Sequence, residues 1–164
     1  MSKPNLSAED LVAWLETTST NWRKLLNAHP DLLTQPCDVA GVRSVGELLQ
    51  HIVAVELRYA ERLADLPVSD YANIPFDSVD AIYTTHEHST AILRQLLNSN
   101  IDWNTSIEYM TRSYGPARSS RKTILFHALL HGIRHYAQLA TLARQCGVKP
   151  DWPMDYIFMD IEKV

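Results

Sequence analysis

The sequence contains little glycine and cysteine, and it has no long apolar run. Only 5 of the 164 residues are glycine, so tight turns are few, which favours helices over a many-stranded β fold. Cys37 and Cys146 are too few for a disulfide framework. No apolar stretch reaches the ~20 residues that a membrane span needs, and residues 1–14 lack the apolar segment of a signal peptide. We therefore expect a cytoplasmic protein with two free thiols and no membrane partner.

The sequence also lacks an excess of positive charge. Its 15 Lys and Arg residues are outnumbered by 19 Asp and Glu residues, for a net charge of -4. Nucleic-acid affinity comes mainly from Lys and Arg. One local basic group, formed by Arg112, Arg118, Arg121 and Lys122, lies at an expected loop-to-helix junction and is more typical of a solvated surface than of a DNA site. We expect no nucleic-acid partner.

What the sequence does contain is four long amphipathic helical patterns. The chain is long enough for one domain, residues 1–164, and its 46% hydrophobic content is ordinary for a globular protein. Serine or aspartate precedes each pattern, and proline or asparagine follows three of them. The expected helices begin near Ser7, Ser44, Asp77 or Ser78, and Ser120, and they end before His29-Pro30, at Pro67, at Asn98, and near Gln145. We predict an all-α fold, a four-helix bundle.

The segment before the last helix is different in character, and we expect a long irregular connection there. Ile107 and Tyr109 alternate with polar neighbours, which is compatible with one short strand. Tyr114-Gly115-Pro116 is typical of a turn. After the last helix, residues 151–164 are expected to form an extra turn or short helix.

Histidines recur every four residues in the last predicted helix, at His127, His131 and His135. Each step of four residues turns a helix by about 40° and rises about 6 Å, so the three lie along one stripe. Two imidazoles four residues apart are within reach of one metal ion. The same stripe, which adjoins Arg134 and Gln138, could equally be the solvated face of the helix.

His51 favours the metal interpretation because it lies in the middle of the second helix, among apolar residues. Metal sites in bundles are assembled from facing helices, and three nitrogens with open positions are typical of catalytic sites. His86, on the third helix, is an alternative ligand. Glu47 and Glu56 are candidates for orienting a ligand or acting as a base, although surface carboxylates are the simpler interpretation.

Two segments resemble a known family. Residues 45–63 resemble the second helix of the DinB/YfiT-like family, and residues 129–148 resemble its last helix, whose pattern is His-x3-His-Arg-Gly-Gln-Leu. Here Tyr136 and Ala137 replace the usual Arg and Gly, and the two histidines and Gln-Leu are kept. The resemblance implies a bundle, usually dimeric, with a metal site formed by His51, His131 and His135. His127 does not match the motif and would lie beside the ligands or the substrate.

Family members of known activity include S-transferases and isomerases that use low-molecular-weight thiols. The resemblance therefore implies one divalent ion, Ni or Zn first and Fe or Mn second, and a thiol cosubstrate that is transferred to a small electrophile. A metal-dependent hydrolase and a non-enzymatic, stress-related metal-binding dimer remain the alternatives. We expect a homodimer that binds a small molecule.

Overall fold

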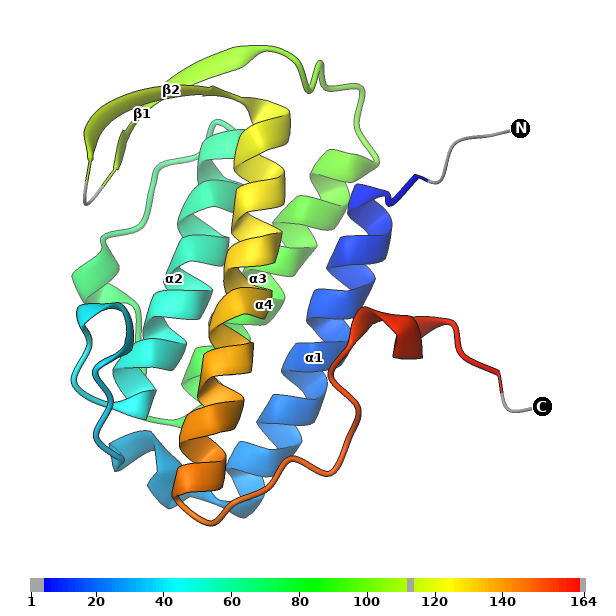
Figure 1. Cartoon of the computed structure of the whole chain (residues 1–164). Coiled ribbons are helices and arrows are strands. Elements are labelled where there is room, and N and C mark those ends of the chain that lie inside the picture. The colour runs from blue at the N-terminus through cyan, green and yellow to red at the C-terminus, as the bar shows by residue number, and fades with distance from the viewer. Residues whose placement is uncertain (1–4, 112–113, 163–164) are drawn as a thin grey trace.

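Four helices form a bundle in the computed structural model, which describes residues 5–111 and 114–162 (Figure 1). They are α1 (Ala8–Ala28), α2 (Val45–Leu63), α3 (Val79–Leu97) and α4 (Arg121–Gln145). Helices α1 and α2 each pack mainly against α3 and α4. Consecutive helices α1 and α2 are therefore diagonal to each other, and so are α3 and α4. The facing pair α2 and α4 carries His51, His131 and His135.

A serine caps the N-terminus of every bundle helix. The side-chain oxygens of Ser7, Ser44, Ser78 and Ser120 each accept a hydrogen bond from the backbone N–H three residues later. In α1 the Asp10 carboxylate also accepts from the Ser7 backbone N–H, which completes the predicted capping box. The four helix starts predicted from the sequence are confirmed.

The predicted four-helix bundle is confirmed, but the fold is not strictly all-α, because the long connection before α4 contains a small antiparallel sheet. Strands β1 (Ser106–Thr111) and β2 (Gly115–Ser120) pair antiparallel there. The side chains of Ile107 and Tyr109 pack against the bundle from one face of β1, so burial alternates along the strand. The turn predicted over Tyr114-Gly115-Pro116 extends too far along the chain, because Gly115 already belongs to β2 and pairs with Thr111. A left-handed φ of +85° at Gly115 suits the end of a tight hairpin.

The termini of the described chain lie on the α1 side of the bundle (Figure 1). The C-terminal tail forms the expected extra turn, a 3-10 helix over Tyr156–Met159. The Tyr156 ring packs edge-on against Trp14 of α1, with ring centroids 5.3 Å apart. Trp152 packs in the same way against Trp22. Aromatic contacts therefore hold the tail to α1.

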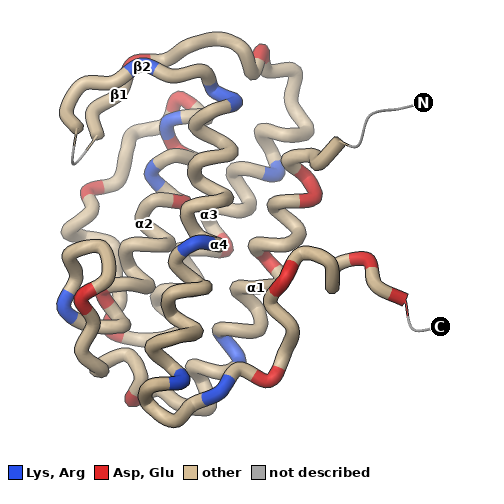
Figure 2. The backbone as a smooth tube through the Cα atoms, viewed as in Figure 1, with Lys and Arg blue, Asp and Glu red and all other residues tan. Residues whose placement is uncertain are grey.

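Charged residues of both signs are interspersed over the backbone rather than gathered in one region (Figure 2). In the basic group singled out above, Arg118 forms an ion pair with Glu108, and Arg121 forms one with Asp65. Arg112 lies outside the described residues. The absence of a nucleic-acid partner stays a prediction. Within residues 5–111 and 114–162, none of the helices is long and apolar enough to cross a membrane.

Candidate metal centre

Three histidines from α2 and α4 meet inside the bundle. One ring nitrogen from each of His51, His131 and His135 lies within 4.8 Å of the other two. The His131 and His135 rings are closest, with centroids 4.4 Å apart, and the His51 ring lies 4.8 and 5.0 Å from them. His131 and His135 are 7% and 2% exposed, so they do not belong to a solvated stripe. We call these three residues the histidine cluster.

Gly132 allows α4 to lie close enough to α1 and α2 to bury the cluster. A Cβ atom at this position would lie 2.9 Å from Glu56 Oε1 and 3.0 Å from Leu15 Cδ1. A larger residue here would require the ends of the Glu56 and Leu15 side chains to shift. Since Gly132 directly follows His131, the same contact fixes the depth of His131 in the bundle.

The hydrogen bond between His135 and Gln138 makes Nε2 the ligand nitrogen of His135. Its Nδ1–H donates to Gln138 Oε1 over 2.6 Å, so the neutral ring carries its lone pair on Nε2. That Nε2 lies 3.2 Å from His131 Nε2. Ligand nitrogens around a tetrahedral ion with bonds of 2.0–2.1 Å are about 3.4 Å apart. The separation of this pair of nitrogens fits a metal ion, but the Arg134 guanidinium, which donates to His135 Nε2 over 3.0 Å, has to move aside for the ion.

The electrostatics of the cluster also fit a cation. Burial, together with the neighbouring His135 and His51, lowers the pKa of His131 to about 2. Burial likewise lowers the pKa of His135, although the Gln138 hydrogen bond opposes the shift. His131 Nδ1 is buried and has no partner within the described part of the chain. The cluster thus offers neutral nitrogens, as imidazole ligation requires.

The depressed pKa of His131 predicts acid sensitivity of the metal-free protein. Below about pH 6.5 the unfolded chain binds a proton at this residue and the folded chain does not, so stability falls as pH falls. From pH 7 to pH 5 the loss from His131 is expected to be about 2 kcal/mol. Urea unfolding at both pH values measures it. His131→Asn should reduce the pH dependence by about that amount, and an unchanged dependence in the variant would contradict the shift.

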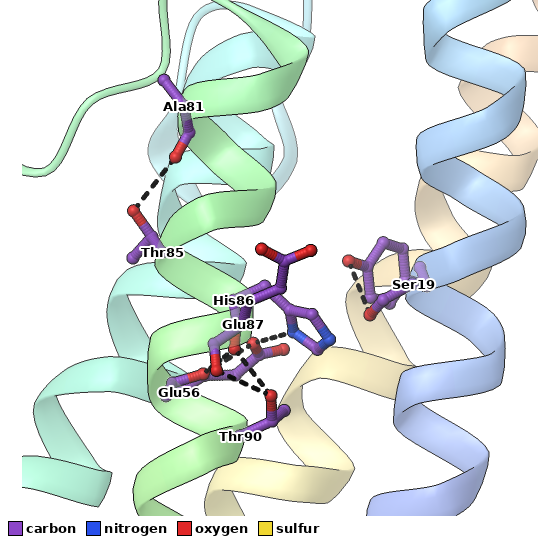
Figure 3. A network of polar contacts seen from close by, with 9 residues as sticks. Ser19, Glu56, Ala81, Thr85, His86, Glu87 and Thr90 are labelled. Atoms are coloured by element: carbon purple, nitrogen blue, oxygen red, sulfur yellow. Dashed lines mark hydrogen bonds and ion pairs between the residues drawn. The ribbon is translucent and has the colours of Figure 1, made fainter.

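The other candidate residues lie outside the cluster. His127 is on the same helix but packs edge-on against Tyr59, with centroids 5.3 Å apart. The Glu47 carboxylate accepts from the backbone N–H and the guanidinium of Arg43, which agrees with a surface role. His86 Nδ1 instead lies 2.7 Å from Glu56 Oε2 (Figure 3). His86 is therefore paired with a carboxylate and does not join the three histidines.

The interpretation of Glu56 as a surface carboxylate is wrong. Its side chain is fully buried between α2 and α3, where His86, Ser89 and Thr90 form a polar network (Figure 3). Burial by itself lowers the pKa of His86, but the Glu56 carboxylate outweighs this effect and the pKa is raised. The sequence did hold a signal, since Glu56 follows the buried residues Leu49, Ile52 and Val53 at helical spacing.

A pocket that the sequence did not predict opens beside the cluster. It has a volume of about 360 Å³, within the usual range for small-molecule sites. His51 belongs both to the cluster and to the pocket wall. The other walls include Arg58, Tyr59 and Arg62 of α2, Tyr71, and Thr111 at the end of β1. Gln50 holds the Tyr71 segment in place, because its side-chain amide donates to the carbonyls of Tyr71 and Ile74. We call this cavity the α2 pocket.

Comparison with known proteins agrees with the sequence resemblance. A family model described as the DinB family matches residues 1–163. No curated protein matches the chain. The match covers all four helices, the hairpin and the three histidines.

Proposed function

This chain belongs to the DinB family, and we propose that it is a metal-dependent enzyme that joins a low-molecular-weight thiol to a small electrophile. The observation that carries the proposal is the placement of the histidine cluster, since its three nitrogens converge and one of its members, His51, also lines a pocket large enough for a small molecule. A purely structural metal site would usually be closed by four protein ligands. Here the described residues bring together three.

His51, His131 and His135 would hold one divalent ion. Imidazole nitrogen suits zinc and nickel better than manganese, and iron is also compatible. A divalent ion bound by three neutral imidazoles is a Lewis acid that lowers the pKa of a coordinated thiol. Gln138 would fix the ring orientation of His135 through the hydrogen bond already described.

The protein's contribution to the transfer is to position the two reactants. The α2 pocket would hold one of the two reactants beside His51, and the buried positions of His131 and His135 exclude bulk water from the opposite side. The thiol sulfur forms a bond to the electrophilic carbon, and the leaving group departs with the electron pair of the bond that breaks. The thiol proton is released to solvent.

The test is conjugation by metal-loaded protein. Protein loaded with zinc or nickel is incubated with glutathione, bacillithiol or mycothiol and a panel of aryl halides and epoxides. Product should form only with metal and should be absent for His135→Ala. The matched control is His88→Ala, because His88 is an exposed histidine of α3 outside the cluster. Metal-dependent hydrolysis without conjugation would favour the hydrolase, and neither reaction would favour a non-enzymatic metal-binding protein.

We also propose that the protein is a homodimer. Apart from the family membership, support comes from apolar side chains on the C-terminal tail, where Ile157 is 67% exposed and Ile161 is 56% exposed. Apolar groups clustered on a surface are typical of an interface. Light scattering over a range of protein concentrations measures the mass, and a monomer at high concentration would contradict the proposal.

A further inference from the structure

Two arginines share the α2 pocket with His51. Along α2, His51, Arg58 and Arg62 are separated by seven and four residues, so they lie on one face of the helix. All three line the pocket. Seven residues of helix correspond to a rise of about 10 Å, and helical side chains lean toward the N-terminus, which for these arginines is the side of His51.

Neither arginine has a carboxylate partner within residues 5–111 and 114–162. The Arg62 guanidinium donates to the backbone carbonyls of Arg58 and Met110 and lies over the Tyr59 ring, 5.1 Å from its centroid. Arg58 Nε is buried and has no hydrogen-bond partner among these residues. The neighbouring acid, Glu61, is bound by the backbone N–H and the hydroxyl of Ser69.

The other arginines show how unusual this arrangement is for the molecule. Of the seven other arginines that the structure describes, two, Arg134 and Arg144, are exposed and form no ion pair, and five form ion pairs with Asp or Glu: Arg23, Arg43, Arg94, Arg118 and Arg121. These pairs are mostly on the surface, whereas Arg58 and Arg62 are partly buried side by side in a concave site. Burial and the charge of Arg58 lower the pKa of Arg62, so the folded protein bears an electrostatic cost there that an anion would relieve.

We propose that Arg58 and Arg62 form an anion subsite that binds the carboxylate of a small molecule whose reacting atom lies at the histidine cluster. Two guanidinium groups and an aromatic wall suit a planar carboxylate on a short apolar chain. Because the arginine side chains lean toward His51, the carboxylate lies closer to the reacting atom than the rise of about 10 Å, and about five to seven bonds separate the two. The identity of the reacting atom rests on the proposed function, but carboxylate binding by the arginines does not.

The subsite can be tested without metal. Calorimetric titration of metal-free protein compares hexanoate with 1-hexanol, which share the apolar chain and differ in charge. Hexanoate should bind at least about tenfold more tightly, since hydrogen bonds to charged groups are the stronger ones. Equal binding of the acid and the alcohol to the wild-type protein would overturn the proposal, and this comparison needs no variant.

Variants then assign the effect to the two arginines. Arg58→Gln and Arg62→Gln should each reduce hexanoate affinity by about tenfold and leave hexanol unaffected. The matched control is Arg144→Gln, because Arg144 is an exposed arginine of α4 whose side chain bonds to Thr141. Loss of affinity in the control as large as in Arg58→Gln would overturn the assignment, because it would show a general charge effect.

A third titration separates the subsite from the proposed function. Zinc-loaded protein is titrated with ω-mercaptoalkanoates of increasing length and with mercaptoalcohols of the same length. Preference for the acid should peak at about five to seven bonds and be lost in Arg58→Gln. Carboxylate preference that persists while the thiol group adds no affinity would keep the subsite and reject thiol binding at the metal. If the electrophile is the reactant that carries the carboxylate, the mercapto acid shows no preference over the mercaptoalcohol. A carboxylate-bearing aryl halide then shows that preference for the acid instead.

Discussion

Replacing His135 by alanine is expected to lower the affinity for a divalent ion by more than about a hundredfold, since loss of even an outer hydrogen-bond partner of a ligand typically costs 10- to 100-fold. His135 supplies one of three nitrogens, and its Nε2 lies 3.2 Å from His131 Nε2. His131→Ala and His51→Ala should behave alike. Gln138→Ala should have an intermediate effect, because it removes only the hydrogen bond that orients His135.

The measurement is elemental analysis of protein purified without chelator or nickel resin, followed by calorimetric titration with zinc. Wild-type protein and His88→Ala should bind one ion per chain. Retention of the same ion with the same affinity in His131→Ala and His135→Ala would reject the histidine cluster as the metal site. A folded far-ultraviolet spectrum for each variant separates loss of a ligand from loss of the bundle.

The helices were predictable because their ends depend on local interactions. A serine hydroxyl that accepts a backbone N–H, as at Ser44 and Ser78, needs only the next three residues. The stop before Pro30 is equally local. The spacing of His131 and His135 is likewise a property of one helix, whereas His51 was proposed from its position among apolar residues of another helix, and the family resemblance supported that choice.

Features that depend on which faces meet were not predictable from the sequence. The spacing of His127, His131 and His135 describes one stripe, but the structure buries the last two and leaves His127 exposed. The hairpin depends on a partner strand as well as on the alternation in β1. Arg58 and Arg62 look like solvated charges until the Tyr71 segment and the end of β1 enclose them.

The buried Glu56–His86 pair predicts that replacing the histidine costs more unfolding free energy than replacing the glutamate. His86→Leu leaves the Glu56 carboxylate fully buried without its counter-charge, and a loss of about 3–5 kcal/mol in unfolding free energy is expected. Glu56→Met leaves an imidazole that can become neutral by releasing its proton. That variant is therefore expected to lose only about 1–3 kcal/mol, the usual cost of a buried polar group without a partner.

The double variant, Glu56→Met with His86→Leu, should be more stable than His86→Leu alone, because removing both partners leaves an apolar contact between α2 and α3. Urea unfolding of the four proteins at pH 7 measures the coupling, expected to be at least about 2 kcal/mol. Additive losses would show that the two groups act independently.

The raised pKa of His86 also predicts how the stability depends on pH. The stability that the Glu56–His86 pair contributes should be complete below about pH 6.5 and decline as pH rises through the raised pKa. The acid sensitivity expected from His131 runs in the opposite direction, so Glu56→Met should steepen the loss of stability on acidification and His131→Asn should flatten it.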